Sequence, residues 1–312
     1  MLKGIVRQNP ALRVTNKPSQ RHDVGDVLHN VWTAQDAKQV VVVLCAHTAQ
    51  FESGRARIAL STLTPHLRVG ACQTPEILGD IEAALACMEA FARQPSSRGV
   101  DLLLFPECFL QGYLVESEHL SRYALDLTAT SFQKILDRLS PIRPTLVFGV
   151  IEQCGAAYFN TAVVVRHGVL EGFYRKTHLV PGERLFQAGD AYPTFNLNGV
   201  TCGINICYDT NFPEAAQAVA EQGSRVLLVP SQNMMKLQAA ETWKCRHNAI
   251  RAERVRETGM WLVSADVTGA RDGSRIGYGP TSVMNPHADV VAQVPTMTVG
   301  MVVAEIWPEP SN

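Results

Sequence analysis

The stretch Gly203-Ile-Asn-Ile-Cys-Tyr-Asp-Thr-Asn-Phe-Pro-Glu214 decides how this chain is interpreted. The residues from Val200 to Ile206 are apolar or favour β-structure, and they predict a strand. Cys207 stands where that strand gives way to a turn and a helix. The free N–H groups at the start of such a helix carry partial positive charge, which favours a thiolate. The stretch therefore predicts a reactive thiol at the end of a buried strand.

Two other stretches end in the same way, each with a different ionisable group. Leu102-Leu-Leu-Phe-Pro-Glu107 is a buried type of strand that ends in a carboxylate, and Val169-Leu-Glu-Gly-Phe-Tyr-Arg-Lys176 ends in a lysine. Pro106 cannot donate a hydrogen bond inside a sheet, so the first of these strands must end there. Each residue alone also has an ordinary interpretation, as a packed cysteine, a solvated glutamate or an exposed lysine. A thiol, a carboxylate and an ammonium at strand ends together favour a covalent catalytic site in an α/β enzyme.

In this order, the three strings resemble the Glu-Lys-Cys triad of the nitrilase superfamily of carbon–nitrogen hydrolases. The resemblance runs from residue 66 to residue 306. Its further segments are Arg68-Val-Gly-Ala-Cys-Gln73, Gly112-Tyr113, Tyr174-Arg-Lys-Thr-His178, Pro181-Gly-Glu183, Gly189-Asp190 and Pro213-Glu214. Any one string is a weak signal, but three in the right order are specific.

The resemblance assigns a role to each member of the triad. It implies that Glu107 is the general base, which takes the proton of the Cys207 thiol and later activates water. Lys176 would stabilise the oxyanion of a tetrahedral intermediate together with a backbone N–H near Tyr208. The reaction would pass through a thioester and would need neither a cofactor nor a metal.

Other residues are expected around the triad. The resemblance implies that Glu183 helps to position the substrate and the lysine. Tyr113 is either a wall or hydrogen-bond donor of the site or a packed core tyrosine, and His178 is expected to pack or to hydrogen-bond rather than to act as a base. Gln232 and Asn233 follow the strand that ends at residue 230 and are expected near the mouth of the site.

Composition and charge exclude several classes of function. The chain has 312 residues, of which 46% are hydrophobic and 18% charged, as in an ordinary globular protein. A net charge of −1 argues against binding to nucleic acid or to an anionic membrane, and the chain has no apolar run long enough to span a bilayer. It contains no P-loop and no zinc-type His-Glu-x-x-His motif. The eight cysteines include no Cys-x-x-Cys pair. Most fall within apolar strands or helix faces, which favours the reducing cytoplasm.

From residue 67 onward, predicted strands alternate with predicted helices. Glycine hairpin signals stand at His167-Gly168 and Asn198-Gly199, and a single long helix is predicted over Leu237–Glu257. Such a pattern is typical of an α/β layered sandwich whose sheets mix parallel and antiparallel pairs. The resemblance implies a four-layer αββα fold that pairs as a homodimer or a higher homo-oligomer. We expect residues 1–65 to be a poorly ordered N-terminal extension and residues 66–312 to form the hydrolase domain.

The residues after Cys207 indicate the substrate. True nitrilases place Trp-Glu there, whereas Tyr208-Asp209 resembles the amidase branches. Relatives that act on carboxylate-bearing substrates commonly have an arginine in the next two positions, which here are the neutral Thr210 and Asn211. We therefore expect hydrolysis of a small neutral amide with release of ammonia. The alternatives are an N-carbamoyl amine or N-carbamoyl amino acid as substrate, and a non-enzymatic binding or assembly module with this fold.

Overall fold

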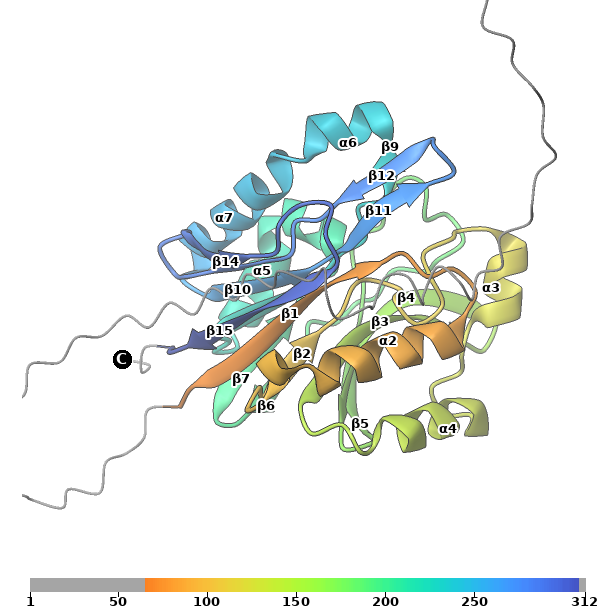
Figure 1. Cartoon of the computed structure of the whole chain (residues 1–312), viewed down its shortest axis with the longest axis horizontal. Helices are drawn as coiled ribbons and strands as arrows, with labels where there is room; N and C mark the ends of the chain where they lie inside the picture. Colours follow the sequence, from red (N-terminus) through yellow and green to blue (C-terminus); the bar gives the residue numbers. More distant parts are fainter. Residues whose placement is uncertain (1–64, 309–312) are drawn as a thin grey trace, which may run out of the picture. The chain divides into compact units, whose positions relative to one another are not determined.

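Two β-sheets packed face to face, with helices on their outer sides, make up the part of the chain that the structure describes. The computed structural model describes residues 65–308 (Figure 1). α2 and α4 lie over one sheet, and α5 and α7 lie over the other. This arrangement confirms the expected four-layer αββα sandwich.

The larger sheet has nine strands in the order β5-β4-β3-β2-β1-β11-β12-β9, and β15 pairs with β1 off this path. Its strands are β1 (Leu67–Pro75), β2 (Leu102–Leu104), β3 (Thr145–Cys154), β4 (Ala157–Arg166), β5 (Val169–Arg175), β9 (Met235–Lys236), β11 (Val267–Arg271), β12 (Arg275–Tyr278) and β15 (Gly300–Ile306). β1, β2 and β3 are parallel to one another, whereas β3, β4 and β5 form an antiparallel run. The predicted mixture of parallel and antiparallel pairs is confirmed.

The smaller sheet has six strands in the order β14-β13-β10-β8-β7-β6. Its strands are β6 (Thr194–Leu197), β7 (Val200–Ile204), β8 (Val226–Pro230), β10 (Trp261–Ala265), β13 (Ser282–Met284) and β14 (Val290–Gln293). β7, β8 and β10 run parallel, and the remaining neighbours are antiparallel.

Central strands such as β2 and β8 are apolar on both faces because both faces are covered. In β2, Leu102 and Leu104 face the core between the two sheets, while Leu103 packs under the helices of the larger sheet. In β8, Leu228 faces the core between the sheets and Leu227 packs under the helices of the smaller sheet. Successive side chains of a strand point to opposite faces, so strands buried on both sides read as unbroken apolar runs.

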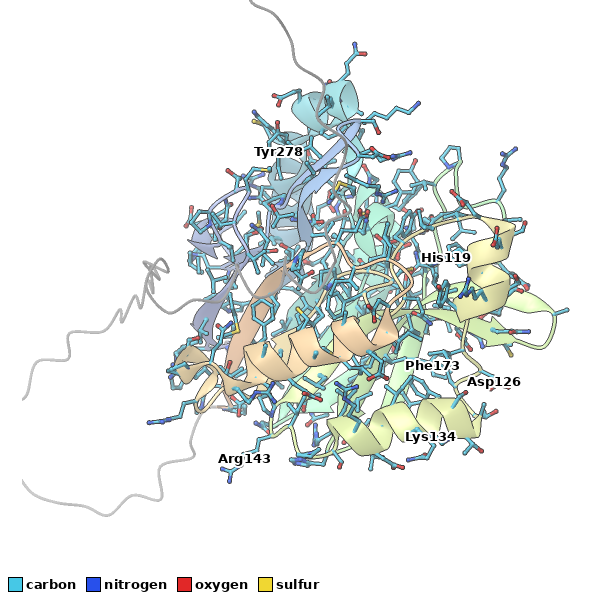
Figure 2. All side chains as sticks on the ribbon, turned by 45° about the vertical axis from the view of Figure 1, so that its right-hand side comes forward. His119, Asp126, Lys134, Arg143, Phe173 and Tyr278 are labelled. Atoms are coloured by element: carbon cyan, nitrogen blue, oxygen red, sulfur yellow. The ribbon has the colours of Figure 1, made fainter. Side chains whose placement is uncertain are left out.

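Four helices cover the outer faces of the two sheets. They are α2 (Ile81–Arg93), α4 (Thr130–Leu139), α5 (Pro213–Ala220) and α7 (Arg246–Thr258). The Asp80 side chain accepts a hydrogen bond from the Ala83 N–H at 2.9 Å and caps the start of α2. In α4, Phe132 is buried against the sheet and Lys134 lies on the exposed face (Figure 2).

The predicted single helix over Leu237–Glu257 is wrong. The segment forms α6 (Leu237–Trp243) and α7, separated at the exposed Lys244 and Cys245. α6 contacts β9 and β12, whereas α7 contacts α5 and β10. The two halves therefore pack on different elements. The prediction was wrong because it treated the periodic apolar residues as one continuous helix face. The short elements α3 (Ser117–Tyr123), β9, β11 and β12 were not predicted.

Both predicted hairpins are confirmed, and their turn residues have the positive φ that tight hairpins need. φ is 50° at His167 and 76° at Gly168, and it is 52° at Asn198 and 84° at Gly199. Among residues 65–308, no helix combines the length and the apolar character needed to cross a bilayer. The expected extension over residues 1–65 lies outside the described residues except for Pro65, so the domain boundary stays a prediction.

Candidate active site

The three expected catalytic residues meet at the ends of strands that come from different sheets. Glu107 follows β2 and Lys176 follows β5 in the larger sheet, while Cys207 follows β7 in the smaller sheet. All three line one cavity of about 470 Å³. The carboxyl ends of parallel strands are the usual place for such a cavity in layered α/β folds.

Glu107 and Lys176 form a buried ion pair. Lys176 Nζ donates to Glu107 Oε1 at 2.7 Å, and each side chain is 1% exposed. The turn that carries Glu107 lies directly against β3 at Gly149, where a Cβ would come within 2.1 Å of the backbone N of Cys108. Glycine at that position therefore allows the close backbone approach that fixes Glu107.

Burial and neighbouring charges shift the pKa values of both Glu107 and Lys176. Burial raises the pKa of Glu107 to about 7, although Lys176 opposes the rise; Glu183 adds to it. Burial alone would lower the pKa of Lys176, but Glu107 and Glu183 outweigh it and raise that pKa well above its usual value. The lysine thus stays charged, while the carboxyl can exchange a proton near neutral pH.

Glu183 lies where the resemblance implied, beside the lysine. Its side chain is fully buried and accepts hydrogen bonds from Lys176 Nζ at 3.1 Å and from the Val180 N–H at 2.8 Å. Asn160 Nδ2 bridges the two glutamates, at 2.7 Å from Glu107 Oε1 and 2.9 Å from Glu183 Oε1. Sequence reasoning missed Asn160, although a lone amide inside the apolar strand β4 was a signal that it serves a buried polar group.

Cys207 sits in a strained turn. Its φ is 44°, in the left-handed region that a residue with a Cβ rarely adopts, and it opens a 3-10 turn over Cys207–Asn211. Burial, followed by the charge of Glu107, raises the pKa of the Cys207 thiol, although Lys176 acts in the opposite direction. Burial in this site therefore acts against the resting thiolate that the helix end is expected to favour.

Asp209 ties the nucleophile turn to the strand that carries the lysine. Its fully buried carboxylate accepts hydrogen bonds from the Ile206 N–H and from Tyr174 Oη, both at 2.8 Å. It also accepts one from the His178 N–H at 2.8 Å. Sequence reasoning used Asp209 only to distinguish the amidase branches from true nitrilases. It missed this role because the partners of Asp209 lie far away along the chain.

The remaining expected residues also lie at the cavity or beside it. Tyr113, Tyr208, Thr210 and Asn211 line the cavity. Tyr113 is also partly buried against the cluster around Cys108. His178 lies outside the lining, stacks on Phe212 at 3.9 Å between ring centroids and reaches Asp209, as expected of a packing residue.

A second buried polar group lies behind the nucleophile. Gln232 and Asn233 line the cavity as expected, and Cys207 Sγ lies 3.8 Å from Asn233 Oδ1. Asn233 is bound in turn to the fully buried Asp266, whose carboxylate lies 3.8 Å from Arg251. Asp266 directly follows the apolar strand β10, so the strand-end signal that found the triad also marks this residue.

The rim of the cavity combines apolar and cationic side chains. Trp243 and His247 line it from α6 and α7, and burial lowers the pKa of His247 to about 3, with Arg251 adding to the effect. The imidazole is therefore neutral at physiological pH. Lys236 and Arg275 also line the cavity and face each other directly across the β9–β12 pair.

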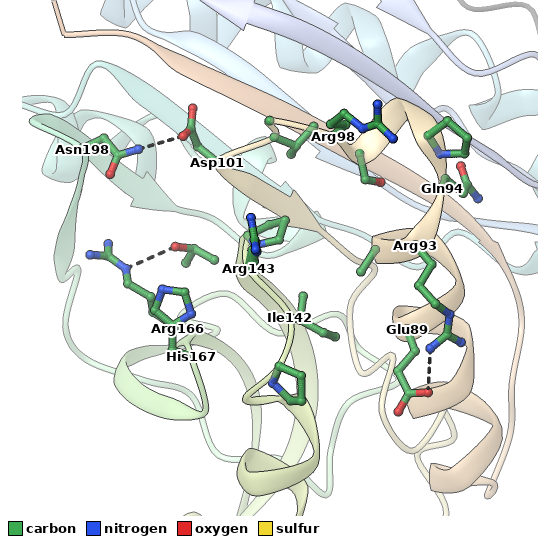
Figure 3. A pocket seen from close by; sticks show the side chains of 18 of the residues that line it. Glu89, Arg93, Gln94, Arg98, Asp101, Ile142, Arg143, Arg166, His167 and Asn198 are labelled. Carbon is green, nitrogen blue, oxygen red and sulfur yellow. Dashed lines mark hydrogen bonds and ion pairs between the residues drawn. The ribbon is translucent and has the colours of Figure 1, made fainter.

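A larger hollow of about 990 Å³ lies elsewhere and is not the candidate site (Figure 3). It is lined by Asp101 and Thr145, which stand at the amino ends of β2 and β3, together with several arginines such as Arg98 and Arg143. Glu107 instead stands at the opposite, carboxyl end of β2. The hollow therefore lies at the other end of the sheet from the triad.

Comparisons with known proteins identify the family of this chain. The carbon–nitrogen hydrolase family model matches residues 68–309. An (R)-stereoselective amidase of Pseudomonas sp. is 31% identical over 61% of this chain and 68% of its own length. Omega-amidase NIT2 of Homo sapiens is 30% identical over 66% of this chain and 77% of its own length.

Solved structures show the same fold. An amidase from Nesterenkonia sp. superposes with a TM-score of 0.67 at 23% identity, over 80% of this chain and 93% of that one. A glutamine-dependent NAD+ synthetase from Acinetobacter baumannii superposes with a TM-score of 0.68 at 21% identity, over 79% of this chain but only 48% of the synthetase. Because the family model covers most of the sequence, this chain belongs to the carbon–nitrogen hydrolases of the nitrilase superfamily, on their amidase-like side, and is a hydrolase rather than a binding module.

Proposed function

We propose that the protein hydrolyses a small neutral primary amide through a cysteine thioester and releases ammonia. The observation that carries this proposal is the buried Glu107–Lys176 ion pair, with a 2.7 Å contact, in the same cavity as Cys207. This arrangement places a base, a fixed positive charge and a nucleophile around one reacting carbon.

The reaction begins from a neutral thiol, because burial raises its pKa. Glu107 takes the thiol proton as sulfur attacks the amide carbon, and the negative charge that develops on the carbonyl oxygen is met by Lys176. The backbone N–H of Tyr208 stands in the first turn of a helical segment, where N–H groups have no intrahelical acceptor, and it supplies a second donor.

Glu107 then passes the proton to the amide nitrogen, the carbon–nitrogen bond breaks, and ammonia leaves. Water attacks the resulting thioester with Glu107 again as the base, and the carboxylic acid and free thiol are released. In total, one amide and one water yield one acid and one ammonia. Glu183 and Asn160 hold Glu107 and Lys176 in place without taking part in bond making.

A neutral acyl group fits the charges near the scissile bond. Thr210 Oγ1 donates to the Cys207 carbonyl at 2.8 Å, and Asn211 Nδ2 donates to the Tyr208 carbonyl at 3.1 Å, so neither presents a cation to the substrate. Arg251 is bound to Ser231 Oγ and to the Pro280 carbonyl. Among the fold relatives, the amidase from Nesterenkonia sp. was solved with butyramide, which is a neutral primary amide.

One observation favours the alternative, an N-carbamoyl substrate that carries a carboxylate. Lys236 and Arg275 both line the cavity rim, and neither forms an ion pair among the described residues. These cations stand on the β9–β12 ribbon rather than beside the nucleophile turn. A carboxylate held there would lie at the end of the substrate that faces the rim.

Mass spectrometry of the intact protein tests the thioester. Incubation with butyramide should add the mass of the butyryl group to the wild-type protein and release ammonia. The Cys207→Ala variant should do neither, and ammonia release from that variant would remove the proposed nucleophile. A cytoplasmic location and assembly as a homodimer or larger homo-oligomer remain predictions from the sequence.

A further inference from the structure

Asn233 places a polar side-chain atom beside the nucleophile. Its Oδ1 lies 3.8 Å from Cys207 Sγ, the side chain lines the cavity, and the residue is only 4% exposed. The triad mechanism makes no use of this atom. An amide oxygen can only accept hydrogen bonds. It can therefore accept one from the Cys207 thiol or one from an N–H group of a bound molecule.

Asp266 fixes which end of the Asn233 amide faces the cavity. Its Oδ1 accepts the Asn233 backbone N–H at 2.9 Å, and its Oδ2 accepts Asn233 Nδ2 in a short hydrogen bond. Turning the amide over would place two acceptor oxygens against each other and would leave Nδ2 without its carboxylate. The oxygen is therefore held toward the sulfur.

Asp266 is held in place by a buried network of its own. It is fully buried, it accepts the Val267 N–H at 2.9 Å, and Arg251 Nη2 lies 3.8 Å away. Arg251 is anchored by Ser231 Oγ at 2.9 Å and by the Pro280 carbonyl at 2.8 Å. Burying a carboxylate and a guanidinium is costly, and here the network keeps one amide oriented at the reacting atom.

We propose that Asn233 is a specificity-determining residue whose Oδ1 accepts a hydrogen bond from the N–H of the scissile amide, and that Asp266 is the positioning residue that orients it. This inference rests on the proposed amide hydrolysis. In the free enzyme the thiol proton points to Oδ1. A bound amide replaces that contact with its own N–H and leaves the thiol proton to Glu107.

The consequence is selection of amides over esters of the same acyl group. An ester places an oxygen lone pair where the amide has an N–H, so two acceptors face each other in a site with little water. Sites built to bind a substrate N–H or O–H reject analogues that lack it far more strongly than apolar pockets reject a missing methyl group. The Asn233 amide therefore recognises the nitrogen that leaves rather than the acyl group that stays.

The test compares kcat/KM for butyramide and for ethyl butyrate on the full-length protein. Asn233→Leu keeps the approximate size but removes the acceptor. It should lower kcat/KM for the amide by about 10- to 100-fold, as expected for one lost hydrogen bond in a buried site, and should change the ester value by less than about threefold. Asp266→Asn removes the carboxylate that orients the amide and should lower the amide-to-ester ratio in the same direction.

A matched control comes from the neighbouring amide. Gln232 also lines the cavity, but its Nε2 is bound to Glu76 at 2.6 Å, so Gln232→Leu should leave the amide-to-ester ratio unchanged. Equal losses on amide and ester in Asn233→Leu and in Asp266→Asn would overturn this inference while leaving the proposed function intact. A wild-type protein that forms no acyl adduct with either substrate would instead contradict the proposed function itself.

Discussion

Lys176 Nζ lies 2.7 Å from Glu107 Oε1, and both side chains are 99% removed from solvent. Although it is paired with a lysine, the Glu107 carboxyl can still take up a proton, because burial raises its pKa to about 7. The pair therefore separates two tasks: Lys176 supplies charge throughout the reaction, and Glu107 moves the proton.

The pH dependence of the reaction should report this carboxyl. Glu107 must be ionised to accept the thiol proton, so kcat/KM should rise with pH and level off above about 7, falling by about tenfold per pH unit below it. Asn160→Ala removes a hydrogen bond that lowers the pKa of Glu107, so the rising limb should move to higher pH. A limb near pH 4.5 in the wild type would contradict a raised pKa of Glu107.

Lys176→Arg should be nearly as damaging as Lys176→Ala, although it keeps the charge. The ammonium is bound to Glu107 and Glu183 in a fully enclosed place, where the planar guanidinium fork has a different shape and directs its donors differently. Loss of an oxyanion donor typically costs about 10²–10³ in kcat. Retention of more than about a tenth of wild-type kcat by the arginine variant would mean that only the charge matters.

Asp209→Asn should lower both kcat and the free energy of unfolding. The substitution keeps the size of the side chain but replaces one acceptor oxygen with a donor. It therefore removes the acceptor either of the Ile206 N–H and Tyr174 Oη, which share Oδ2, or of the His178 N–H at Oδ1. We expect a loss of about 1–3 kcal/mol in the free energy of unfolding, with kcat reduced at least tenfold because the Cys207 turn shifts relative to Lys176. Tyr174→Phe removes one of these bonds alone and should cost about 1 kcal/mol. Thermal unfolding and kcat should be measured on both variants to test these losses. An unchanged kcat in Asp209→Asn would contradict the positioning role.

Neutral amides should be hydrolysed with a higher kcat/KM than matched substrates that carry a carboxylate near the scissile bond. Thr210 and Asn211 offer no cation there, and each 1.4 kcal/mol of desolvation penalty costs about a factor of ten. Asn211→Arg should narrow the gap between butyramide and succinamic acid. If the wild type prefers the acid, the cations to remove next are Lys236 and Arg275 at the rim, because Arg175 is bound to Glu152 and Arg251 is bound to Ser231 and Pro280.

The sequence predicted those parts of the site that depend on local signals. Glu107, Lys176 and Cys207 each end a strand, and a change from apolar to polar residues is visible without knowledge of the fold. Asp209 and Asn160 gain their roles only from partners brought close by sheet packing, which no local pattern encodes. The same limit explains the long helix that proved to be α6 and α7. Periodicity predicts that a segment is helical, but the break between the two depends on what each half packs against.

The division of the triad between the two sheets has a consequence for folding. Glu107 and Lys176 extend from β2 and β5 of the nine-stranded sheet, and Cys207 extends from β7 of the six-stranded sheet. A chain in which each sheet has formed but the two have not yet docked would have native-like hydrogen bonding and no assembled nucleophile. Turnover is therefore an assay for one late event, the closing of the apolar layer between the sheets, and in a refolding experiment it should recover with that layer rather than with the strands.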